Sequence, residues 1–161
     1  MDRETDDSQV ADANTFVLAH CNVARAKGSY EDPIMQGFVD RLDPLHELAD
    51  NHPGFIWRYD PPDDDDTVLR VFGDDRVLFN LSLWESVETL GTYVYRTVHK
   101  EAIRKRDEWF VPFGGPSMVL WWVAADHQPP VAEAKDRLDR LGRDGPTEHA
   151  FTFKHRFARP S

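Results

Sequence analysis

Residues 77–84 read VLFNLSLW, and this stretch carries the strongest strand signal in the chain. Alternate side chains of a strand point to opposite faces, and one face here is purely apolar: Phe79, Leu81 and Leu83. The other face mixes apolar with polar side chains: Leu78, Asn80, Ser82 and Trp84. A buried Asn80 or Ser82 needs a hydrogen-bonding partner. These two residues therefore either line a pocket or bond across a subunit interface.

Five other segments are predicted to be strands: residues 16–23, 55–59, 67–72, 117–124 and 151–157. The first, FVLAHCNV, alternates in the same way and places His20 and Asn22 on one face. Residues 117–124 are almost continuously apolar, which is typical of a strand in the middle of a sheet. The tail 151–157 alternates phenylalanines with polar residues, which predicts a strand with one solvent-exposed face.

Three segments carry the three- and four-residue spacing of helices: residues 32–49, 87–109 and a segment from Pro130 to a cap at Gly142. Pro44 predicts a kink or a split in the first helix. With the small segment 67–72 set aside, the order is β-α-β-β-α-β followed by α-β, which predicts an α+β fold with a ferredoxin-like, split β-α-β antiparallel sheet and a C-terminal helix and strand. Two helices cover one face of such a sheet, and a partner subunit is expected on the other.

Length and composition indicate one domain over residues 15–158 of the 161, with a disordered tail at 1–14 and a short tail at 159–161. The net charge of −10 argues against nucleic acid as a partner. Cys21 is the only cysteine, so neither an internal disulfide nor a paired-cysteine zinc site is expected. The opening residues lack the features of a secretory signal, and the apolar run at 118–125 is too short to cross a membrane. A cytoplasmic location is expected.

No phosphate-binding glycine loop, nucleophile elbow or helical histidine pair is present. What remains is a polar and aromatic group on the helix predicted at 87–109, where Tyr95, His99 and Arg106 share one face. His99 is either a half-buried structural histidine or a ligand-binding or catalytic residue. Asn22 and Trp84, near the ends of their strands, are candidates for lining the same pocket.

Seven strings, in chain order, resemble an uncharacterised bacterial family of unknown function: LAHCNVAR, GFIWRY, NLSLWESVETL, YVYRTVHK, RDEWFVPF, MVLWWV and AFTFKHRF. They span most of residues 16–157, and the family belongs to the dimeric α+β barrel group that includes antibiotic-biosynthesis monooxygenases. The resemblance implies a homodimer of ferredoxin-like protomers packed sheet to sheet. In haem-degrading members of the group, an asparagine, a tryptophan and a histidine surround the haem. Asn22 and His99 resemble the first and last of these, and Tyr93 or Tyr95 stands where the tryptophan is expected.

Three functions follow as hypotheses. The first is a cofactor-independent, monooxygenase-like protein that binds an aromatic or quinol-type small molecule. Trp84, Tyr93, Tyr95 and Arg106 would then contact the ligand, Asn22 would donate to an oxyanion, and His99 would relay a proton. The second is a haem-binding protein with His99 as axial ligand. The third is a non-catalytic dimer, a ligand-binding or interaction module, in which the same residues fill the core and the interface.

Overall fold

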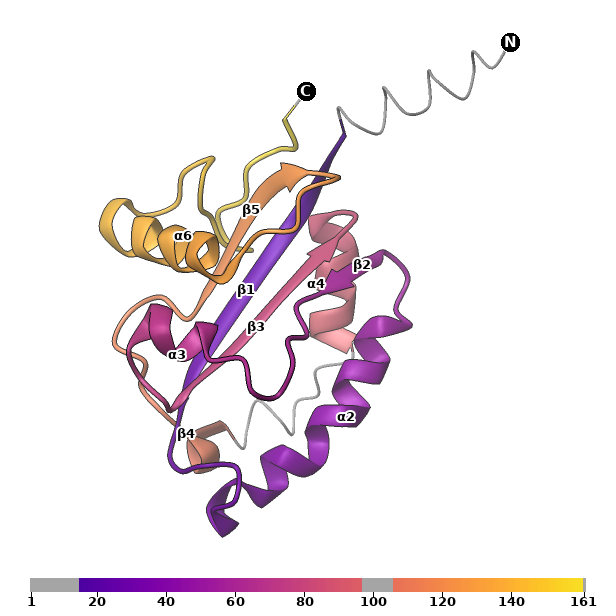
Figure 1. Cartoon of the computed structure of the whole chain (residues 1–161). Coiled ribbons are helices and arrows are strands. Elements are labelled where there is room, and N and C mark those ends of the chain that lie inside the picture. The colour runs from indigo at the N-terminus through magenta and orange to yellow at the C-terminus, as the bar shows by residue number, and fades with distance from the viewer. Residues whose placement is uncertain (1–14, 97–105, 161) are drawn as a thin grey trace.

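A computed structural model describes residues 15–96 and 106–160 of the chain (Figure 1). The segments 1–14 and 97–105, the latter with His99, lie outside the described residues, as does residue 161. The elements follow in chain order: β1 (Phe16–Ala26), η1 (Pro33–Met35), α2 (Gln36–Asp50), β2 (Phe55–Arg58), α3 (Thr67–Phe72), β3 (Val77–Trp84), α4 (Val87–Arg96), β4 (Phe110–Val111), β5 (Met118–Ala124) and α6 (Val131–Asp144). Within the described residues, no helix is long and apolar enough to span a bilayer.

The strands form one antiparallel sheet around β1. β3 pairs with one edge of β1, and β5 and then β4 pair with the other edge. β2 pairs only with β3, so β1 and β2 run parallel with β3 between them. This is the split β-α-β arrangement, and it confirms the ferredoxin-like α+β fold. The bounds of β3 are those predicted from its alternation.

Helices cover both faces of the sheet, α3 and α6 on one and α2 and α4 on the other (Figure 1). The purely apolar face packs against α6 through Ala134, Leu138 and Leu141. Ala19 and Leu81 on this face are fully buried within the single chain. The chain thus covers with its own helices the face on which a partner subunit was expected. Dimerisation stays a prediction, and it requires a surface other than this one.

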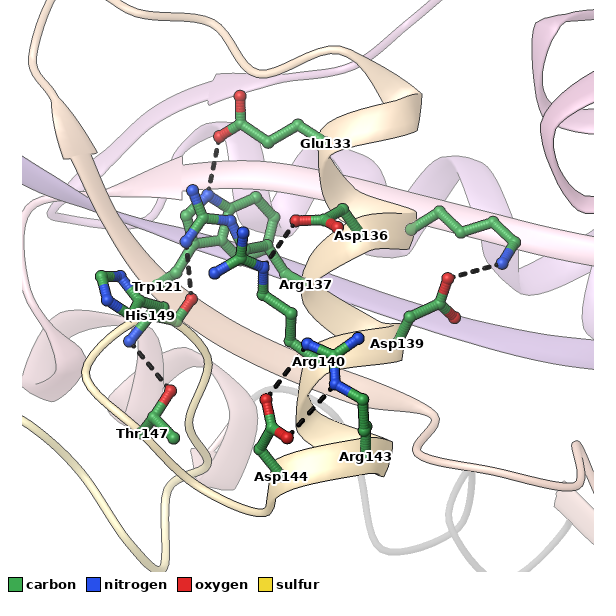
Figure 2. Close-up of polar contacts among 11 residues, drawn as sticks. Trp121, Glu133, Asp136, Arg137, Asp139, Arg140, Arg143, Asp144, Thr147 and His149 are labelled. Atoms are coloured by element: carbon green, nitrogen blue, oxygen red, sulfur yellow. Dashed lines mark hydrogen bonds and ion pairs between the residues drawn. The ribbon is translucent and has the colours of Figure 1, made fainter.

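Polar contacts also hold α6 on the sheet (Figure 2). The indole Nε1 of Trp121 donates to Glu133 Oε2 at 2.9 Å, and His127 Nε2 lies 2.7 Å from Glu133 Oε1. Arg137 lies over the ring of Trp121 and donates from Nη1 to the carbonyl oxygen of His149 at 2.8 Å. These contacts join α6 to β5 and to the loop that follows α6, and they hold the helix against this face of the sheet.

The prediction of a strand at 67–72 was wrong, since Thr67–Phe72 forms helix α3. Val68 and Phe72, four residues apart, both pack into the core, and residues at this spacing share one face in a helix and in a strand alike. Gly73, at φ 69°, ends the helix and donates from its amide to the carbonyl oxygen of Leu69. In a six-residue apolar segment, the helical and strand periods cannot be told apart from sequence alone.

Other features also differ from prediction. The tail does not form a strand over 151–157: its amide and carbonyl groups pair with Leu120 of β5 at Phe151, and the chain then bends. α6 continues past Gly142 and ends before Gly145, whose φ of 73° suits glycine. α2 accommodates Pro44 without splitting.

Candidate functional site

Four polar side chains lie together on the face of the sheet that α2 and α4 cover: His20 and Asn22 of β1 with Asn80 and Ser82 of β3, hereafter the polar row. The strand register places His20 opposite Ser82 and Asn22 opposite Asn80. Directly opposed side chains on one face of an antiparallel pair lie close enough to interact. The row therefore forms a two-by-two block on the two central strands.

The two asparagines form the outer half of the polar row. Asn80 Nδ2 donates to Asn22 Oδ1 at 2.9 Å. Asn22 is exposed and Asn80 is half-buried; Asn22 lies on the central strand β1, and Asn80 lies on β3 beyond the residues that pair with β2. Among the described residues, this bond leaves the amide NH₂ of Asn22 and the carbonyl oxygen of Asn80 without a protein partner. The pair thus presents one donor group and one acceptor group to an incoming molecule.

His20 forms the inner half of the row together with Ser82. Its side chain is 8% exposed, and its Nδ1 has no hydrogen-bond partner in the described part of the chain. Burial lowers the pKa of His20 from its ordinary 6.5 to about 4. The imidazole is therefore neutral at pH 7, with one donor and one acceptor nitrogen. It is a buried group with unused hydrogen-bonding capacity.

An aromatic group closes one end of the row. Trp84 is 1% exposed, donates from Nε1 to Ser82 Oγ at 2.9 Å and stacks on Tyr93, with ring centroids 5.2 Å apart. His52 and Phe55 contact Trp84 edge-on. Tyr93 donates from its hydroxyl to the carbonyl oxygen of Leu45 at 3.2 Å, and burial raises its pKa. The group is a packed end wall in which Trp84 is buried and Tyr93, His52 and Phe55 are half-buried.

The structure brings together some of the residues predicted for the site and separates others. Asn22, Trp84 and Tyr93 lie on the same side of the sheet, and Ser82 joins Trp84 to the polar row. Tyr95 is 77% exposed and lies beside Phe153, so it does not join Trp84 and Tyr93. Arg106 is exposed, and His99 lies outside the described residues.

α2 covers the polar row incompletely. Just before its start, Met35 is buried in a cluster with Leu78, whereas near its end Ala49 is buried in a cluster with Trp84. Leu78 and Trp84 flank Asn80 and Ser82 on β3, so the two ends of α2 share clusters with residues on either side of the row. Fifteen helical residues span roughly 22 Å and the six-residue step along β3 roughly 20 Å, so the two lengths match.

The apolar side chains in the first two-thirds of α2 are only half-buried: Phe38, Val39, Leu42 and Leu45. Ala49 is the only fully buried residue of the helix, all of which is described. A helix that lay flat on the sheet would bury this stripe. The helix is therefore anchored at its two ends, and the apolar side chains between them stay partly exposed.

A surface hollow of about 450 Å³ lies elsewhere, between the start of α4 and the C-terminal segment. Arg156 forms an ion pair with Glu88 at 3.0 Å there, and Arg159 lies over the ring of Trp122. No residue predicted for the site lines this hollow. Its two arginines are engaged with the protein itself, and it is not the candidate site.

Comparison with known proteins identifies the family. The model of a domain of unknown function, DUF3291, matches residues 17–161. The chain belongs to the DUF3291 family. This confirms the prediction of a family without an assigned function. No curated protein matches the chain. Among solved structures, the DUF3291 chain is similar to a putative antibiotic biosynthesis monooxygenase from Chloroflexus aurantiacus J-10-fl, with 13% identity and a TM-score of 0.41 over 71% of this chain and 98% of that one.

The described residues of the DUF3291 chain do not fit a haem. A haem needs an open apolar slot and a histidine nitrogen that faces it. Trp84 and Tyr93 are stacked on each other, His52 is held edge-on against both, and His20 is buried. Haem ligation by His99 thus stays a prediction about a residue that the structure does not describe.

Alternation along β1 places His20 on the same face as Asn22, but no sequence pattern distinguishes His20 as a site residue. A histidine in a strand is ordinarily a satisfied core or surface residue. The unpartnered Nδ1 becomes visible only when its neighbours on β3 and β5 are known. The strand pairing, which sequence does not provide, is thus what assigns His20 to the site.

Proposed function

We propose that this protein binds a small, neutral aromatic molecule of the quinol type between the polar row and α2. One observation carries the proposal: the amide pair of Asn22 and Asn80 is accessible on two neighbouring strands of a helix-covered face. Inner strands under a helix normally carry buried apolar side chains. Polar groups placed there, next to half-buried apolar side chains, are the composition of a ligand site.

The chemistry of the row supports a neutral ligand. Its four side chains carry no net charge at pH 7, since His20 is neutral. An anion or cation would lose hydration there without gaining a counter-charge. An aromatic ring would contact the apolar stripe of α2, and its oxygen would accept a hydrogen bond from the amide of Asn22.

The described residues favour binding over proton-abstracting catalysis. A phenolic hydroxyl has a pKa of about 10, and His20 has one of about 4. Moving a proton between them would cost about 8 kcal/mol, at 1.36 kcal/mol for each pKa unit. His20 is thus not a base for such a ligand. Relay of a proton by His99, and with it monooxygenase-like turnover, stays a prediction.

The test is a titration with 1-naphthol, followed by intrinsic tryptophan fluorescence and calorimetry. We expect saturable binding to the wild type and ~3–10-fold weaker binding to Asn22→Ala, the loss of one hydrogen bond. Asn51→Ala is the matched control, because Asn51 lies at the end of α2 and bonds to Glu47. Equal affinities in all three proteins, or no saturation, would refute the proposal.

Oxygen uptake with a naphthohydroquinone decides whether binding leads to turnover. Uptake above the rate of autoxidation, lost in Asn22→Ala, would make the protein a cofactor-independent oxygenase. Uptake equal to autoxidation, together with saturable naphthol binding, would leave it a binding protein, as proposed.

A further inference from the structure

We infer that His20 determines the specificity of this site, as a neutral acceptor for a hydroxyl group of the ligand. The inference rests on the proposed function and adds a requirement to it: the ligand must donate a hydrogen bond. It starts from the Nδ1 atom of His20, which is buried and has no hydrogen-bond partner among the described residues. Buried polar atoms without a partner are uncommon, and each calls for an explanation.

The neighbours of His20 on the sheet do not provide that partner. On β3 it lies opposite Ser82, whose Oγ accepts a hydrogen bond from Trp84. On β5 it lies opposite Leu120, which has no polar side-chain atom. The next residue on the same face of β1 is Asn22, whose oxygen accepts from Asn80. The central strand thus carries one unused ring nitrogen next to an accessible amide pair.

The Nδ1 atom of His20 is an acceptor for two reasons. A buried N–H without a partner is rarer in proteins than an acceptor with unused lone pairs. The ring therefore keeps its proton on Nε2 and leaves the lone pair on Nδ1. Burial also holds the pKa of His20 at about 4, so the ring does not become a double donor near neutral pH.

The same position makes His20 selective. A bound molecule can accept from Asn22 with one lone pair of its oxygen and donate the proton of that oxygen to His20. A hydroxyl group does both, whereas an ether or a carbonyl oxygen only accepts. Because His20 is 8% exposed, the ligand must enter between the sheet and the helices above it. A ligand oxygen that carries no proton would then leave Nδ1 of His20 without a hydrogen bond in a site shielded from water.

The test compares 1-naphthol with 1-methoxynaphthalene, which lacks the proton. The wild type should bind naphthol ~5–10-fold more tightly than the ether. His20→Leu should bind both equally. His20→Asn should restore the preference, because its amide oxygen occupies the δ position of the side chain, as Nδ1 does. Equal binding of both compounds by the wild type would overturn the inference and leave the proposed function intact; binding of neither would refute both.

A second readout does not depend on the folding of the variants. In protein labelled with ¹⁵N in its imidazole rings, naphthol should shift the Nδ1 resonance of His20, and methoxynaphthalene should not. His149, which is exposed in the loop after α6, supplies the internal control. Naphthol binding without a shift at His20 Nδ1 would overturn the inference even if every variant misfolded.

Discussion

Buried His20 should make the folded state sensitive to acid, and the size of the effect follows from its pKa. The ordinary pKa of 6.5 applies to the unfolded chain, and burial lowers it to about 4 in the folded chain. Below pH 6.5 the imidazole of His20 takes up a proton in the unfolded chain, whereas in the folded chain it stays neutral until the pH reaches about 4. His20 therefore costs the protein stability between pH 6.5 and 4, and above pH 6.5 it costs nothing of this kind.

The full loss is about 3 kcal/mol below pH 4, and about 2 kcal/mol has been lost at pH 5. This is a large share of the stability of a single domain. His20→Leu, which replaces the ring with an apolar side chain, should not show this loss. At pH 7 the free energy of unfolding of the variant should be no more than ~1 kcal/mol below that of the wild type, because the substitution removes an unpaired polar atom.

Urea unfolding, followed by circular dichroism at pH 7.0, 6.0, 5.0 and 4.5, measures the difference. The comparison with His20→Leu is essential, because other groups also make the protein less stable in acid. Hydrogen bonds lower the pKa values of Asp65 and Asp74, and protonation of these carboxylates destabilises both proteins alike. The wild type should lose ~2 kcal/mol more than the variant between pH 7 and 5. Parallel loss in the two proteins would refute the reasoning.

Three further predictions concern packing and reactivity. Gly54→Ala should cost at least ~2 kcal/mol in urea unfolding, because Gly54 has φ +90° and a Cβ there would overlap Thr89; a cost below ~0.5 kcal/mol would contradict this. Tyr93→Ala should cost ~3 kcal/mol and Tyr95→Ala less than ~0.5 kcal/mol, and similar losses would show that the inward tyrosine is misassigned. Cys21 is buried, which raises the pKa of its thiol, so it should resist Ellman's reagent at pH 8 until urea unfolds the chain; rapid reaction of the native protein would contradict its burial.

The order of the strands and most of their bounds could be predicted, because period-two alternation is a local signal. Residues 77–84 carried it clearly, and β3 has those bounds. The helix at Thr67–Phe72 could not be separated from a strand, since six residues hold fewer than two turns. The placement of α6 over the apolar face, where a partner subunit had been expected, depends on tertiary packing.

The sequence places the candidate residues on their strands and helix, but it does not show which strands lie side by side. Asn22 and Trp84 were candidates because each lies near the end of its predicted strand. The hydrogen bond from Asn80 to Asn22, in contrast, depends on the register of two strands whose residues are 58 positions apart. Tyr93 and Tyr95 are two residues apart on a helix and so point in nearly opposite directions. Only one of them can face the sheet, and the packing of α4 turns Tyr93 inward.

The claim that the polar row binds a small aromatic molecule is tested most directly by the side-chain amide resonances of the asparagines during a titration of ¹⁵N-labelled protein with 1-naphthol. The signals of Asn22 and Asn80 should shift together and saturate, while that of Asn51 stays in place. Saturable shifts elsewhere in the spectrum with Asn22 and Asn80 unmoved would contradict the account.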